Sequence, residues 1–182
     1  MCNMANSISI LAIPGSLRPD SSSHKVIEAI AAIKDDTVDL KVWNGLADIP
    51  PFDGAEDVAP AVRDFRAAIQ AADAVLICTP EYAFGIPGAL KNALDWTVVS
   101  GSLNEKVTGL ITASSNGIYA HEAMLLVLRA LGARVPDGGR LLIRFIKAVL
   151  DEGGHIKDEG VRQQLIGFWH VLIAAVPQDT QS

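Results

Sequence analysis

The sequence lacks the features that mark several common classes of protein. Its apolar runs fall short of the roughly 18 residues that a membrane-spanning helix needs. The first six residues precede the first apolar run directly and carry no basic region of the signal-peptide kind. We therefore expect a cytoplasmic protein with no membrane partner. Cysteine is scarce, and Cys78 ends an apolar run, which favours a buried structural thiol.

Excess positive charge and metal-binding patterns are also missing. The formal net charge is -6, which disfavours a nucleic-acid partner because such proteins usually present a basic face. The histidines show no metal-ligand spacing, so no metal site is expected. There is no Gly-x-Gly-x-x-Gly fingerprint, Walker loop or Gly-x-Ser-x-Gly elbow. A nicotinamide nucleotide, if bound, is therefore not expected to be held by a Rossmann fingerprint.

What the chain does contain is an alternation of apolar strands and amphipathic helices. With 182 residues and 49% hydrophobic residues, it fits one domain over 1–182. Strands are expected over the ranges 8–13, 38–42, 74–78, 107–113 and 140–145, with helical periodicity between most of them and after the last. Such alternation predicts an α/β fold, a doubly wound five-stranded parallel sheet of order 2-1-3-4-5 with helices on both faces. The loops after strands 1, 3 and 4 would then meet at one edge.

The first of these loops combines groups that bind anions. Residues 14–23 follow a buried strand and supply Pro, Gly, four hydroxyls and Arg18. One of Ser21, Ser22 or Ser23 is the expected N-cap of the next helix. A helix N-terminus attracts anions, and a guanidinium can contact phosphate with two hydrogen bonds. The alternative is an ordinary capped strand–helix turn with a surface arginine.

The second loop carries a longer motif. It reads Pro80-Glu81-Tyr82-Ala83, then Pro87-Gly88-Ala89-Leu90-Lys91-Asn92-Ala93-Leu94-Asp95-Trp96. It resembles the NADPH-dependent FMN reductase family, whose loop runs Pro-Glu-Tyr-Asn, then Pro-Gly-x-Leu-Lys-Asn-Ala-Ile-Asp-Trp. The segment Gly15-Ser16-Leu17-Arg18 is similar to the phosphate loop of that family, Gly-Ser-Leu-Arg-x-x-Ser-x-Asn. The resemblance covers nearly the whole chain and implies a flavodoxin-like fold.

The resemblance also implies the cofactor and the residues that hold it. FMN would be bound through its phosphate by one set of side chains, and its ring would be lined by two further loops, mostly through main chain. The residues concerned are Ser16, Arg18, Ser21 and Ser23 for the phosphate, Pro80, Glu81, Tyr82 and Ala83 for the ring, and Ser114, Ser115, Asn116 and Gly117 for its other side. The family has Asn where this chain has Ser23 and Ala83. Ser23 keeps one hydroxyl, whereas Ala83 offers only its backbone.

The function implied is that of an FMN-dependent oxidoreductase. Hydride would pass from NADPH or NADH, as transient co-substrate, to bound FMN and on to an acceptor such as flavin, a quinone, an azo compound or chromate. No side-chain acid or base is required, so no catalytic residue is assigned. The alternatives are a flavodoxin-type electron carrier and a relative that binds another ligand without FMN. A homodimer or homotetramer is expected, both from the resemblance and from the apolar helix near Trp96.

Overall fold

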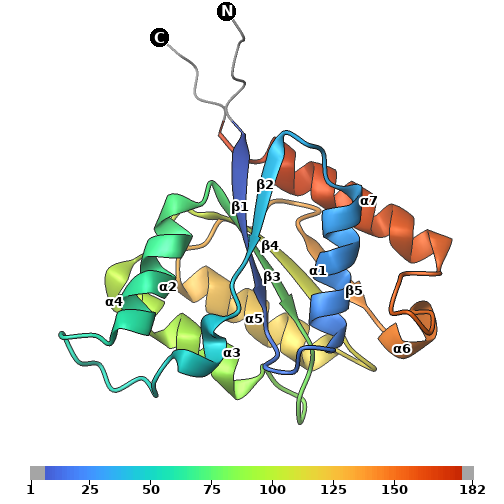
Figure 1. Cartoon of the computed structure of the whole chain (residues 1–182). Coiled ribbons are helices and arrows are strands. Elements are labelled where there is room, and N and C mark those ends of the chain that lie inside the picture. The colour runs from blue at the N-terminus through green and yellow to red at the C-terminus, as the bar shows by residue number, and fades with distance from the viewer. Residues whose placement is uncertain (1–6, 178–182) are drawn as a thin grey trace, which may run out of the picture.

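The fold centres on a five-stranded parallel sheet, seen in a computed structural model that describes residues 7–177 (Figure 1). The strand order is β2-β1-β3-β4-β5. The strands are β1 (Ile8–Pro14), β2 (Val38–Val42), β3 (Ala74–Thr79), β4 (Val107–Ala113) and β5 (Arg140–Ile143). Every residue of β3 and β4 is buried, whereas β2 at the edge exposes three of its five positions. The predicted order and parallel direction are confirmed.

Helices cover both faces of this sheet. One apolar core lies beneath α1 (Ser22–Ile33) and α7 (Glu159–Ala174). The other lies beneath α2 (Pro60–Ala71), α3 (Gly88–Asp95) and α5 (Ile118–Ala130). Figure 1 shows these two layers on opposite sides of the strands. Three short elements complete the chain: the 3-10 turn η1 (Gly45–Asp48), α4 (Thr97–Ser100) and α6 (Ile146–Val149).

Some helix ends carry recognisable capping residues. Ser21 is the N-cap of α1 and accepts a hydrogen bond from the His24 N–H, and Asp158 caps α7 in the same way. Gly132 takes a positive φ of 71° just beyond α5, as expected of a residue that ends a helix. The connections at the carboxyl edge of the sheet, after β1, β3 and β4, gather at the lower end of the view in Figure 1.

The region after β4 differs from the sequence expectation. The strand predicted over 140–145 ends at Ile143. Phe145 adopts the left-handed conformation with a φ of 52°, and the chain turns at once into α6. A residue with positive φ cannot continue a parallel strand. The connection between β2 and α2 contains η1, which packs Leu46 into the core.

Within residues 7–177, no helix combines the length and the apolar character needed to cross a membrane.

Candidate functional site

The three loops predicted to converge do meet around one crevice. The crevice has a volume of about 290 Å³ and opens at the carboxyl edge of the sheet. Its walls come from the β1–α1, β3–α3 and β4–α5 loops and from the α6 segment, with Arg18, Ser21, Ser22, Pro80, Glu81, Tyr82, Ser114, Ser115, Ile146 and Lys147 among its lining residues. Segments more than 100 residues apart in sequence therefore build one site.

The β1–α1 loop is fixed to the β3–α3 loop by a hydroxyl pair. The buried Ser16 Oγ lies 2.8 Å from the Tyr82 hydroxyl oxygen and also accepts the Arg18 backbone N–H at 3.2 Å. Gly15 lies so close to β3 and α3 that a Cβ there would stand 2.7 Å from Thr79 Oγ1. The loop is therefore held tightly at its base, while the Arg18 side chain remains exposed at the crevice.

Of the three serines at the start of α1, two form the helix cap and one lines the crevice. Ser21 caps the helix, and its Oγ lies 2.8 Å from both Ser23 Oγ and His24 Nδ1. Ser22 lines the crevice and donates its hydroxyl to the Ala113 carbonyl at the end of β4. Ser23 is fully buried, so its hydroxyl supports Ser21 from behind and does not face the crevice. The backbone N–H groups of Ser22 and Ser23 have no acceptor among the described residues.

Glu81 joins the two loops predicted to line the ring. Its carboxylate accepts the Gly117 N–H at 3.2 Å and the Ala120 N–H at 3.0 Å. These are orphan donors at the N-terminus of α5, where a negative charge is stabilised. The side chain of Glu81 thus caps a helix that begins 37 positions later in the chain, and the sequence alone gave it no such partner.

The tip of the β3–α3 loop is a two-residue reverse turn. Tyr82 and Gly85 exchange both backbone hydrogen bonds across it, at 3.0 and 2.9 Å. Ala83 and Phe84 at its centre have φ values of 48° and 57°. Positive φ at both central positions is the requirement of a type I′ turn, which Asn and Gly satisfy best. The turn leaves Phe84 exposed, with its ring 5.3 Å from that of Tyr119 on α5.

The β4–α5 loop forms the opposite wall. The Ser114 and Ser115 backbones pair with the end of β5, through the Ser114 N–H to the Ile143 carbonyl and the Phe145 N–H to the Ser115 carbonyl, both at 3.1 Å. Arg144 donates to the Asn116 side-chain carbonyl at 3.2 Å. Gly117 is buried with a φ of 83°, and a Cβ there would stand 2.9 Å from Leu142.

The second half of the long motif has a structural role. Asn92 accepts the Phe52 N–H at 2.7 Å and donates to the Pro50 carbonyl, which also accepts the Trp96 indole N–H at 2.8 Å. Lys91 pairs with Asp95 on the helix surface. The Asn92 and Trp96 contacts therefore fasten the segment after η1 to α3.

Two further titratable groups near the sheet, His121 and Cys78, do not line the crevice. Burial, with the Arg140 guanidinium, lowers the pKa of His121, against a smaller opposing effect of Glu122. His121 Nδ1 lies 2.9 Å from Thr112 Oγ1 behind the β4–α5 loop. Cys78 is buried as predicted, and that burial raises the pKa of its thiol. Among residues 7–177 no cluster of His, Cys, Asp and Glu could hold a metal ion.

The donor set of the crevice suits a phosphorylated flavin. Free N–H groups at the start of α1 and the Arg18 guanidinium lie at one end and can bind a phosphate. At the other end, the N–H groups of Ser115 and Asn116 lack acceptors among the described residues. The structure also adds residues that no sequence signal identified, namely Lys25, Ile146, Lys147 and Leu150. Lys25 follows the first motif on α1, whereas Ile146, Lys147 and Leu150 lie far from the motifs in sequence and reach the crevice through α6 and the residue after it.

Comparison with known proteins agrees with this assignment. Residues 8–147 match the family model described as NADPH-dependent FMN reductase. The chain is 30% identical over 178 residues to a quinone reductase of Escherichia coli, covering 90% of this chain and 93% of that one. It is 29% identical over 169 residues to a 2-hydroxy-1,4-benzoquinone reductase of a Burkholderia species, and the match covers 88% of this chain and 92% of that protein. Among solved structures, FerB of Paracoccus denitrificans, a flavoenzyme NAD(P)H:(acceptor) oxidoreductase, superposes with a TM-score of 0.76 at 22% identity, covering 93% and 97% of the two chains.

Proposed function

The chain belongs to the NADPH-dependent FMN reductase family, and we propose that it reduces quinone-type acceptors with NAD(P)H through FMN held in the three-loop crevice. The observation that carries this proposal is the convergence of a phosphate-binding loop and two walls rich in free N–H groups at one sheet edge. Bound FMN supplies the hydride chemistry between the nicotinamide and the acceptor.

The chain's own residues would bind and orient the cofactor. Arg18 and the N-terminus of α1 would neutralise the phosphate, with Ser16 and Ser21 shaping the loop and Ser23 acting through Ser21. The main-chain N–H groups of Glu81, Ala83, Ser115 and Asn116, which have no acceptor among the described residues, would face the ring, where fixed dipoles stabilise the negative charge of a reduced flavin. Charge-assisted hydrogen bonds contribute about 1.5–3 kcal/mol each, while association costs about 4–15 kcal/mol. Phosphate and ring contacts are therefore both needed for retention.

Two findings support a quinone over an inorganic oxyanion as acceptor. Large apolar side chains are exposed on two of the three loops and on the neighbouring elements: Leu17 on the β1–α1 loop, Tyr82 and Phe84 on the β3–α3 loop, Tyr119 on α5 and Phe145 before α6. Exposed apolar groups gathered at one place mark a surface that binds apolar partners. The relatives from Escherichia coli and Burkholderia are both named for quinone reduction.

An anaerobic absorbance experiment tests this function. The purified protein, after addition of FMN and removal of the excess, should be yellow and should bleach when NADPH is added. Colour should then return on addition of benzoquinone. Colour that persists after NADPH would instead indicate an electron carrier, and a protein that retains no FMN would indicate a relative that binds a different ligand.

The proposal also covers the domain organisation, the cellular location and the oligomeric state of the protein. We place residues 1–182 in a single FMN-binding domain, acting in the cytoplasm, where the NAD(P)H pool is available. We also propose a homodimer or homotetramer, supported by the exposed Val98 and Val99 on α4, immediately after Trp96. Fractionation of the source cells and light scattering test these two statements.

A further inference from the structure

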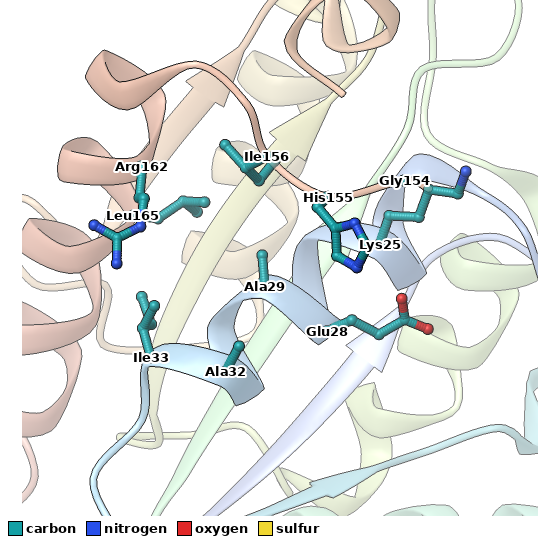
Figure 2. A pocket seen from close by; sticks show the side chains of 10 residues that line it. All are labelled: Lys25, Glu28, Ala29, Ala32, Ile33, Gly154, His155, Ile156, Arg162 and Leu165. Atoms are coloured by element: carbon teal, nitrogen blue, oxygen red, sulfur yellow. The ribbon is translucent and has the colours of Figure 1, made fainter. Parts of the chain in front are cut away.

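A second cavity lies beside the crevice, between helices α1 and α7. This groove has a volume of about 410 Å³ and is closed along its upper side by residues 154–156 of the segment before α7 (Figure 2). It contains none of the residues that the family motif assigns to FMN. Its position on α1, away from the loops, makes it a separate compartment.

The groove is lined by short and branched apolar side chains. Ala29 and Ala32, three positions apart on α1, share one face of that helix and add little side-chain bulk to the groove. Ile33, Ile156 and Leu165 are the larger apolar residues that line it. Apolar walls with a few polar groups are typical of sites for small organic ligands, an aromatic base among them.

The rim of the groove carries two permanent cations, although the chain has a net charge of -6. Arg162, His155 and Lys25 stand around it, with Glu28 as the acidic member. Arg162 lies 3.6 Å from Glu159, and His155 lies 3.4 Å from Asp151. Both pairs are exposed and therefore contribute little, so a phosphate can replace the carboxylates at small cost.

Lys25 connects the groove to the FMN crevice, because it lines both. Its side chain crosses the backbone of Gly154, where a Cβ would stand 2.9 Å from Lys25 Cδ, Cε and Nζ. Gly154 is buried, with a φ of 85°. No carboxylate of residues 7–177 lies within ion-pair distance of the Lys25 amine. The junction of the two compartments thus carries an uncompensated positive charge.

We propose that this groove binds the adenosine end of NADPH, an inference that rests on the proposed function. The nicotinamide end must reach the crevice, and a dinucleotide leaving it past Lys25 would place its pyrophosphate near that amine. The adenine would lie on Ala29 and Ala32, and the 2′-phosphate would lie within reach of Arg162 and His155. This arrangement needs no Gly-x-Gly-x-x-Gly fingerprint, which the sequence lacks.

Titration calorimetry with adenosine 2′,5′-bisphosphate tests the site without relying on turnover. The FMN-loaded protein should bind this probe, and bind 5′-AMP more weakly. Arg162→Gln should weaken binding of the bisphosphate roughly ten- to hundredfold, because it removes a charge-assisted hydrogen bond. Ala32→Trp, which fills the groove from an exposed position, should abolish binding. Arg129→Gln, at the end of α5 on the other side of the sheet, is the matched control and should bind as the wild type does.

The outcomes separate this proposal from the proposed function. If the probe does not bind, or binds equally to the Arg162 and Ala32 variants, the groove is not the adenosine site, even when NADPH still bleaches the flavin. Circular dichroism shows whether each variant is folded, and either variant alone is sufficient for the test. If FMN does not bind, the proposed function fails, yet the same titration on the FMN-free protein still reports on the groove.

Discussion

Arg18 brings a guanidinium to the phosphate end of the crevice, and its backbone is already fixed by Ser16. Arg18→Ala should weaken FMN binding by about 1.5–3 kcal/mol, or roughly ten- to hundredfold, since a charge-assisted contact is lost. The FMN affinity of Arg18→Lys should lie between those of the wild type and Arg18→Ala. An ammonium keeps the positive charge but cannot make the bidentate contact of a guanidinium with phosphate. Fluorescence titration of FMN measures the dissociation constants. Equal values for wild type and Arg18→Ala would contradict a phosphate role.

Ala83 occupies a backbone conformation that suits other residues better. Its φ of 48°, followed by 57° at Phe84, places two L-residues in the left-handed region at a cost of about 1–2 kcal/mol each. Asn tolerates this region, so Ala83→Asn should stabilise the protein by up to about 1 kcal/mol and raise the melting temperature by roughly 2–4 °C. Ala83→Val, whose branched side chain fits the region poorly, should lower it. Thermal unfolding followed by circular dichroism compares the three proteins. No rise with Asn would show that the turn carries no such strain.

At the scale of elements, Glu81 fixes the distance between the two walls of the crevice. It is the contact through which the β3–α3 loop caps α5. Glu81→Gln keeps the shape of the side chain but removes its charge and one acceptor. The unfolding free energy should fall by about 1–2 kcal/mol, in the range of a lost helix cap. FMN should bind several-fold more weakly, because the free N–H groups of the β4–α5 loop lose their alignment.

Glu122→Gln is the matched control for Glu81, since it removes the same charge from an exposed position on α5. Denaturant unfolding and FMN titration of both variants separate the two contributions. A Glu81 variant that matches the Glu122 variant in both measurements would show that Glu81 contributes only surface charge.

The elements that the sequence predicts well are those whose signals are local. The buried strands β1, β3 and β4, the Ser21 cap and the parallel order follow from periodicity, capping chemistry and the handedness of crossovers. The same signals bring the loops after β1, β3 and β4 together. The role of Glu81 was not predictable, because its partners are backbone groups of a distant helix. Phe145 shows the same limit, since nothing in Arg144-Phe145 marks a left-handed turn or the folding of α6 toward α1.

At the scale of the whole molecule, the exposed apolar residues of α4 support the proposed homo-oligomer and give it a candidate interface. Val98 and Val99 are 59% and 78% exposed, although Trp96, two positions before Val98, is buried in the core. An apolar pair of this kind on an otherwise well-packed layer favours a subunit interface. In a twofold dimer each position occurs twice, so one substitution acts on both subunits.

Val99→Lys should therefore dissociate the assembly. Burial of a valine contributes about 1.5–3 kcal/mol, and counting both subunits gives roughly 3–6 kcal/mol, a change of about 10²–10⁴ in the dissociation constant. Light scattering at micromolar concentration should give a dimer or tetramer for the wild type and a smaller species for Val99→Lys. Val42→Lys, at an exposed apolar position on the edge strand β2, is the control and should leave the mass unchanged. A monomeric wild type would refute the assembly, whereas an intact Val99→Lys oligomer would place the interface on another face, of which the exposed Tyr119 and Leu126 on α5 form the next to be tested.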